Sequence, residues 1–294
     1  QRQMCIRDSD HIGVADCGRC NKSRIHPEGA TMIRRFLAGA FIALVLGGPV
    51  AAGLFGIELS AHGVPFANGN EEGFLGTEHL GRSVGAAVLV GGRSLVVTAI
   101  IVGSLTTAFG ALFGILGSLK PKLGFFIEAV ADVTILVPAV ILLLLTAVLY
   151  PNGGLPALIG VSVVVGTPYA ARVVATATYP VANAGYVQAA LGSGVSTVSI
   201  ILRDIIPNIS AVLRSVWSLR IIEALYVLAT ASFLGVGRSL GEFAWSAMVR
   251  DNASGISLNP WSVLAPAAAL AATSIAVVAL INGRQKEPKD VPSS

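Results

Sequence analysis

Residues 179–210, which read YPVANAGYVQAALGSGVSTVSIILRDIIPNIS, separate two long apolar regions of the chain. The stretch is too long for a tight turn, and its pattern is too structured for a linker. Ala189 and Ala190 favour a short helix, and Gly194 supplies a stop or a sharp turn. An apolar run then leads to Pro207. The pattern predicts a short helix presented at a membrane surface; the alternative is an amphipathic helix lying in the membrane interface.

Long runs without charged residues flank this stretch and recur along the chain. A membrane span needs about 20 apolar residues, and the run 133–171 is long enough for two spans that YPNGG at 150–154 separates. Backbone groups in lipid must bond within their own segment, which forces each span into a helix. We predict an all-α polytopic membrane protein with the short helix between its fourth and fifth spans. Its six transmembrane helices are expected near 36–56, 94–117, 127–149, 155–178, 211–234 and 261–282.

The composition agrees with a membrane protein. Hydrophobic residues make up 54% of the chain, charged residues only 12%, and the mean hydropathy is +0.75. A soluble globule with so few charges could not cover its surface, and a disordered chain has the opposite composition. The net charge is +4, but the basic residues are spread along the flanks of spans. We therefore expect no nucleic-acid partner.

The first 31 residues differ from the remainder. They hold all three cysteines and lack apolar periodicity. We expect Met32 to be the native start and residues 1–31 to be a non-native or disordered head. The competing hypothesis is a metal site on Cys17 and Cys20. A single CxxC pair without a second pair is a weak zinc signal, so no metal site is expected.

Basic residues predict the orientation of the spans. If the first helix enters from the cytoplasm, most Lys and Arg outside the head fall on the inner side, as the positive-inside bias requires. Both termini, including a tail at 284–294, are then expected to be cytoplasmic. The inner residues would be Arg34, Arg35, Lys120, Lys122, Arg172, Arg203, Arg214, Arg284, Lys286 and Lys289, against Arg82, Arg93, Arg238 and Arg250 outside.

Two groups of residues resemble those of one transporter family. The spacing around the short helix resembles the coupling loop of ABC-importer permeases, and a box before the second span resembles that of the dipeptide, oligopeptide and nickel class. The resemblance covers roughly residues 74–283, with 32–73 forming the first helix and outer loop. The loop residues are Tyr186, Gln188, Ala189, Ala190, Gly194, Arg203, Pro207 and Asn208, and the box residues are Gly76, Thr77, Glu78, Gly81 and Arg82.

This resemblance implies a permease subunit of an ATP-driven importer in a bacterial-type plasma (inner) membrane. Its solutes would be peptides or a related small solute such as nickel complexes, delivered by an extracytoplasmic binding protein. A second homologous permease subunit would complete the path, and ATP-binding subunits would drive it. The chain has no G-x-x-x-x-G-K-[ST] loop, so we expect that it is no enzyme, binds no cofactor and leaves ATP to its partners.

The resemblance also implies roles within the loop. The small Ala189, Ala190 and Gly194 would allow close docking to an ATP-binding subunit, although the two alanines also suit a helix through propensity alone. Gln188 stands where the family usually has Glu, and it would keep a hydrogen bond but lose a charge-assisted one. Arg203 and Asp204 would anchor the loop at the membrane surface.

Charged residues inside the predicted spans have two interpretations. Arg220 and Glu223 are three residues apart on one helix and can pair. They form either a structural ion pair or part of a solute pathway. Glu128 and Asp132 are expected in the first turn of the third helix, where carboxylates suit the helix dipole.

Four further residues carry structural expectations. Trp245 and Trp261 are expected to anchor the outer interface of the membrane. Pro138 and Pro168 are expected to kink their helices.

Two other functions compete with the permease. A channel or secondary transporter working alone would be supported by inverted repeats or paired broken helices, neither of which is clear. An intramembrane enzyme would need a base, metal or nucleophile, and no predicted span contains histidine or cysteine.

Overall fold

The computed structural model of the chain describes residues 27–54, 63–68, 75–235 and 244–282. Within these ranges the fold is helical, and the only strand-like pairing is one isolated bridge between Thr77 and Ser83. The helices are α1 Pro27–Leu54, α2 Val84–Leu119, α3 Pro121–Ile135, α4 Ala139–Leu149, α5 Gly154–Ala182, α6 Gly185–Gly192, α7 Thr197–Ile200, α8 Ile206–Phe233, α9 Trp245–Asn252 and α10 Trp261–Asn282, with single turns η1 Pro151–Gly153, η2 Ile201–Ile205 and η4 Ala253–Gly255.

Five of the described helices are each long and apolar enough to cross a membrane, and α3 with α4 supplies a sixth span if the pair is counted as one. The predicted all-α, multi-pass architecture is therefore confirmed. The second span is longer than predicted, because α2 begins at Val84 and carries Arg93 in its third turn. At 1.5 Å per residue its 36 residues reach about 54 Å, well beyond a hydrocarbon layer of about 30 Å.

The third span is not the single helix predicted over 127–149. α3 and α4 meet at a bend of 80°. Pro138 lacks a backbone N–H and disfavours helical dihedrals at Val137, so α3 ends at Ile135 and α4 restarts after the proline. The expected kink at Pro138 is thus a complete break. Pro168, by contrast, lies inside the uninterrupted α5.

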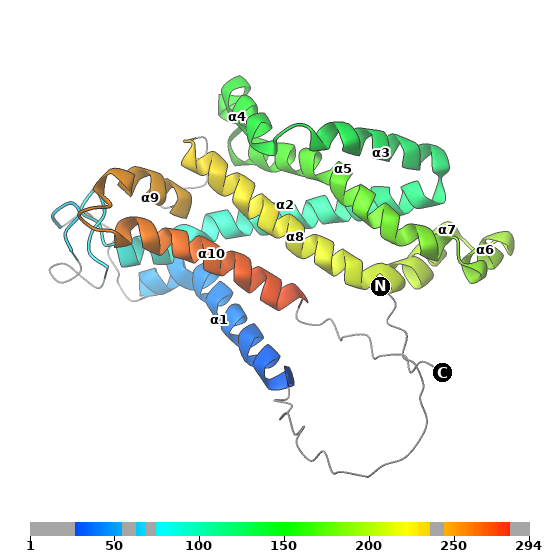
Figure 1. Ribbon diagram of the computed structural model, residues 1–294, viewed down its shortest axis with the longest axis horizontal. Coiled ribbons are helices and arrows are strands. Elements are labelled where there is room, and N and C mark those ends of the chain that lie inside the picture. The colour runs from blue at the N-terminus through cyan, green and yellow to red at the C-terminus, as the bar shows by residue number, and fades with distance from the viewer. Residues whose placement is uncertain (1–26, 55–62, 69–74, 236–243, 283–294) are drawn as a thin grey trace, which may run out of the picture.

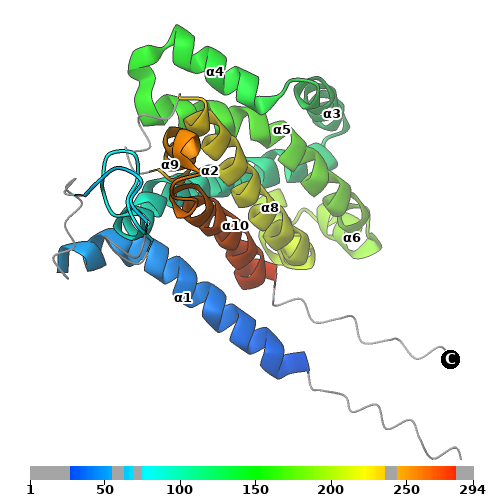
Figure 2. The same cartoon turned by 60° about the vertical axis from the view of Figure 1, so that its left-hand side comes forward.

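The α2 helix is the centre of the bundle. It packs most extensively against α5 and α8, and α1 and α10 cover another side (Figures 1 and 2). Glycines on α2 allow this close packing: a Cβ at Gly103 would overlap Ile221 of α8, and one at Gly110 would overlap Ala170 of α5. Small residues at helix contacts are the usual way in which helices approach in lipid.

Two groups of short elements lie at opposite ends of the long axis. At one end, residues 63–68 and 75–83 pack with α9 and the turn after it; we call this group the cap. At the other end, residues 183–205 carry α6, α7 and η2 between α5 and α8; we call this the α6 segment. Figure 1 shows the cap on the left and the α6 segment on the right.

Two expectations about side chains are wrong. α3 begins at Pro121, so Glu128 and Asp132 are its eighth and twelfth residues and lie beyond its first turn. Trp245 is only 1% exposed, because its ring fills the space beside Gly92 and its Nε1 donates to the Val88 carbonyl at 2.8 Å. Trp261 is half exposed, which suits the anchor expected of it.

The predicted head and tail fall largely outside the described residues. Residues 1–26 and 283–294 are not among them. α1 begins at Pro27, five residues before Met32, so the expected boundary at residue 31 does not coincide with the start of the helix. The proposed native start stays a prediction.

Candidate functional site

The α6 segment is held to the bundle from one side only. Val187, Ile200 and Ile205 are fully buried, and they join a cluster with Ile115 of α2 and Val174 of α5. Val187 carries the inward face of α6, and Ala190 is packed against the same cluster. Three buried side chains, one each on α6, α7 and η2, therefore fix the segment without using the outer face of α6.

That outer face consists of residues singled out in the sequence. Tyr186 is 54% exposed, and Gln188 and Ala189 are also exposed. α6 ends in a left-handed turn at Gly194 (φ 81°), where the Val195 N–H donates to the Ala190 carbonyl at 3.1 Å. The predicted stop at Gly194 is confirmed, and no atom lies within 4 Å of the position its Cβ would take.

Polar side chains of the α6 segment bond within the segment, to the end of α5 or to the start of α8. Gln188 Nε2 donates to the Ala182 carbonyl at 2.8 Å. Asn208 Nδ2 donates to the Asp204 carbonyl at 2.6 Å and to the Tyr186 hydroxyl at 3.3 Å. The structure therefore brings Tyr186 and Asn208 together although 22 residues separate them.

Arg203 and Pro207 occupy the connection into α8. Arg203 is exposed within η2, and Pro207 is the second residue of α8. η2 is a π-type turn, so α7, η2 and α8 run on without a gap in helical backbone. The entry into the fifth span therefore begins near Thr197, before the predicted 211.

The box residues build the cap through its backbone. Gly76 (φ 70°) and Gly81 (φ 75°) both take left-handed conformations, and a Cβ on either would overlap a carbonyl oxygen of residues 63–67. Thr77 is 2% exposed; its hydroxyl donates to the Val64 carbonyl at 2.5 Å and accepts from the Ala67 N–H at 2.9 Å. Glycine and threonine are thus used here for close backbone contact.

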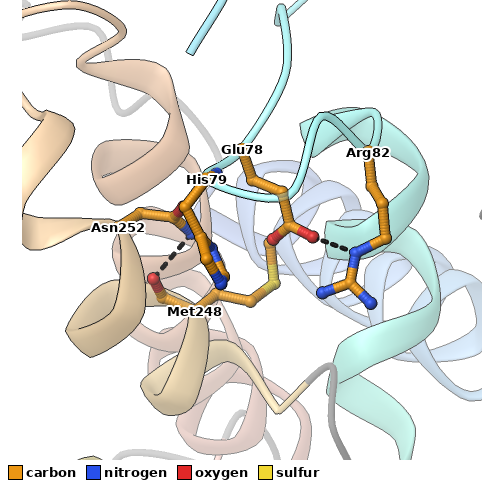
Figure 3. Close-up of polar contacts among 5 residues, drawn as sticks. All are labelled: Glu78, His79, Arg82, Met248 and Asn252. Atoms are coloured by element: carbon orange, nitrogen blue, oxygen red, sulfur yellow. Dashed lines mark hydrogen bonds and ion pairs between the residues drawn. The ribbon is translucent and has the colours of Figure 1, made fainter. Parts of the chain in front are cut away.

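Glu78 is a buried charge with a partner. It is 1% exposed and forms an ion pair with Arg82 Nε, four residues further on (Figure 3). Beside it, the His79 N–H donates to Asn252 Oδ1 at 2.9 Å, and Asn252 Nδ2 donates to the Met248 carbonyl at 2.8 Å. These bonds tie the box to α9, far along the chain.

Sequence reasoning missed the two asparagines that organise the cap. Asn252 and Asn259 are fully buried. Asn259 Nδ2 donates to the carbonyls of Leu75 and Thr77, each at 3.0 Å, while its Oδ1 accepts from the Trp261 N–H at 3.2 Å. An asparagine two residues before the last span is a helix-capping signal that could have been noticed. Its bonds to the carbonyls of Leu75 and Thr77 could not have been predicted from the sequence.

Two ion pairs lie at mid-depth in the bundle. Arg220 and Glu223 pair as the spacing allows, and Arg172 of α5 pairs with Asp132 of α3. Tyr169 lies one turn before Arg172, and its ring centroid is 5.0 Å from Arg220 Cζ. The α5 helix therefore connects the two pairs, which we call the mid-membrane ion pairs. The sequence did not predict the pair between α3 and α5.

A pocket adjoins Arg220 and Glu223 between α2, α4, α5 and α8, and it is lined also by Thr106 and Ser162. Thr106 is 2% exposed, and its hydroxyl has no hydrogen-bond partner. Its neighbour Thr107 instead donates to the carbonyl four residues back, at 2.7 Å. The described ranges contain no group of His, Cys, Asp and Glu that could hold a metal ion.

Comparison with known proteins identifies relatives of this chain. Residues 106–285, more than half of the chain, match the family described as "Binding-protein-dependent transport system inner membrane component". The α6 segment and the mid-membrane ion pairs fall inside this match, whereas the box lies before it.

Individual relatives are permease proteins. The oligopeptide transport system permease protein OppC of Bacillus subtilis (strain 168) is 24% identical over 199 residues, covering 67% of this chain and 65% of that protein. Its namesake from Haemophilus influenzae is 26% identical over 195 residues, covering 66% and 62%. The Salmonella typhimurium protein of that name is 34% identical over 103 residues, covering 35% and 34%. The chain thus spans less than two thirds of the length of these relatives.

Proposed function

Because the chain belongs to the family of binding-protein-dependent transport system inner membrane components, we propose that it is the permease subunit of an ATP-driven importer. An extracytoplasmic binding protein delivers the solute, and a second permease subunit completes the path. ATP-binding subunits supply the driving force, and this chain binds no nucleotide or other cofactor. The names of the relatives support peptides as the solute class.

The observation that carries this proposal is the outer face of α6. A short helix is buried on one side through Val187 and exposes Tyr186, Gln188 and Ala189 on the other. The small side chain of Ala189 on that face lets a groove of another subunit approach the helix closely. Because the segment continues directly into α8, displacing it would move a membrane-spanning helix. This is the mechanical link that a transporter driven by a separate motor requires.

The mid-membrane ion pairs support a solute path on the side of α3, α5 and α8. Asp132 is 64% exposed and Glu223 45% exposed in the single chain. Arg172 and Glu223 each lie ten residues, about 15 Å, from an end of α5 or α8, so the two pairs are inside the bundle and not at its ends. An exposed charge there would cost about 2.5–3.5 kcal/mol against lipid, so this side faces protein or water.

A peptide is a fitting solute for a path that these two ion pairs line. Its two termini carry opposite charges, and the two pairs offer both arginine and carboxylate groups at the same depth. The partnerless Thr106 hydroxyl in the adjoining pocket adds a polar group that a solute or water could use. Specificity within the class belongs largely to the binding protein.

The orientation follows from the same division of labour. The α6 segment is placed at the cytoplasmic face, where ATP is available, and the cap at the outer face, where the binding protein docks. Both termini are then cytoplasmic, in agreement with the positions of the basic residues.

Reconstitution tests the proposal. The tagged chain, expressed with its neighbouring subunits, is expected to co-purify with an ATP-binding subunit, and proteoliposomes should take up peptide only with ATP and binding protein. Uptake that persists without ATP, by a chain that never retains an ATP-binding subunit, would instead establish a channel or secondary transporter.

A further inference from the structure

A groove between α1, α8 and α10 carries two arginines on otherwise apolar walls. Arg35 of α1 and Arg214 of α8 line it together with Ile42, Trp217, Ile221 and Leu280. Its volume is about 480 Å³, within the range of small-molecule sites. Figures 1 and 2 show the first turns of α1 standing away from the bundle at this end.

No carboxylate among the described residues neutralises these two arginines. None of the ion pairs among the described residues includes Arg35 or Arg214, and no acidic residue of the described ranges lines the groove. Both side chains are partly buried. Two uncompensated guanidinium groups over an apolar surface favour an anion that also has an apolar portion.

The depth of the groove identifies the source of that anion. Arg35 lies eight residues after the start of α1, and Leu280 lies two residues before the end of α10, so the groove is at the end of the bundle where α1 begins and α10 ends. An arginine near this end can reach the headgroup level while its stem stays among apolar groups. In the orientation proposed above, this is the cytoplasmic leaflet, which contains the anionic lipids.

We propose that this groove binds one anionic phospholipid of the inner leaflet. Arg35 and Arg214 hold the phosphate, and an acyl chain lies against Ile42, Trp217, Ile221 and Leu280. The bidentate contacts of a guanidinium group suit a phosphate better than the point charge of a lysine ammonium group does. The lipid would fill the space between α1 and the rest of the bundle and so fix the position of the first helix.

The inference uses the proposed orientation to choose the lipid source, but the binding test needs neither ATP nor uptake. The purified full chain is titrated with phosphatidylglycerol in detergent, and bound lipid is counted by native mass spectrometry. We expect one molecule to bind at least tenfold more tightly than phosphatidylcholine. Arg35→Gln/Arg214→Gln should lose that preference, while Arg34→Gln, a change at an exposed neighbour, should keep it.

Other outcomes overturn the proposal. Equal affinity for the two lipids, or unchanged preference in Arg35→Gln/Arg214→Gln, removes the site. Displacement by inorganic phosphate alone would show an anion site without lipid, and loss of binding in the assembled complex would show a subunit interface. Arg35→Lys/Arg214→Lys, which retains both charges, should bind within a few-fold of the original chain; this separates lost recognition from misfolding. A chain that binds lipid yet never transports would retain this site and refute only the proposed function.

Discussion

The cap and the α6 segment lie at opposite ends of the bundle and use their polar groups in opposite ways. In the cap, Thr77, Glu78 and Asn259 are buried, and each of them bonds to another group of the cap. In the α6 segment, Tyr186, Gln188 and Ala189 are exposed, and the buried anchors are aliphatic. The cap is internally complete, whereas the α6 segment presents a surface that its own chain does not cover.

This difference distinguishes a short motif that stabilises its own fold from one that contacts another subunit. The glycines of the box pack against residues 63–67, and His79 bonds the box to Asn252 of α9, so that box specifies structure. Ala189 of α6 is exposed, so its small size matters to something outside the chain. Changes at the cap should therefore act through stability, and changes on the outer face of α6 through association.

The largest effect is expected from Arg82→Gln. The substitution leaves the Glu78 carboxylate buried without its partner, which should lower the free energy of unfolding by about 3–5 kcal/mol. Denaturant titration of the solubilised full chain measures the loss. Arg93→Gln is the matched control, because Arg93 is exposed on the neighbouring α2, and it should stay within about 0.5 kcal/mol.

A double variant sharpens the test of the cap. Glu78→Gln/Arg82→Gln leaves no buried charge and should recover part of the lost stability. If Arg82→Gln and Arg93→Gln destabilise the chain equally, the buried ion pair is not what holds the cap.

The next effect is expected from Ala189→Arg. Its exposed position accommodates the larger side chain, so unfolding should change by less than about 0.5 kcal/mol. Retention of ATP-binding subunits during purification should fall at least tenfold, because the side chain holds α6 off its partner. Ser257→Arg, an equally exposed change next to the cap, should leave retention intact. Undiminished retention in Ala189→Arg would remove the docking role.

The smallest effect is expected from Gln188→Glu. A carboxylate cannot donate to the Ala182 carbonyl, so the bond at 2.8 Å is lost, at a cost of about 1 kcal/mol. Hydrogen–deuterium exchange should quicken over residues 183–193. Gln188→Met, which also lacks the donor, should behave alike. If exchange is unchanged in both variants, the bond does not steady the α6 segment.

Much of the fold could be predicted because lipid imposes simple rules. Runs of apolar residues located five spans and the bent pair of α3 and α4, and Gly194 marked the end of α6. The 80° break between α3 and α4 was foreseen only as a kink, because hydropathy registers how apolar a run is and not its direction. The buried position of Trp245 could not be foreseen, since it depends on Gly92 of a different helix.

The candidate sites were predictable where they are local in sequence. Arg220 and Glu223 pair at a helical spacing, and the residues of α6 follow one another along the chain. The partnership of Asp132 with Arg172 is set by packing of α3 on α5, and that of His79 with Asn252 spans 173 residues. Such contacts require the three-dimensional arrangement of the helices.

Site-specific photo-crosslinking tests the docking of α6 most directly. A photoreactive amino acid is placed at position 189 in cells that express the complete transporter, and at position 257 as the control. The account predicts that position 189 crosslinks to a subunit carrying a nucleotide-binding motif and that position 257 does not. Absence of that product at 189, or equal yields at both positions, would contradict it.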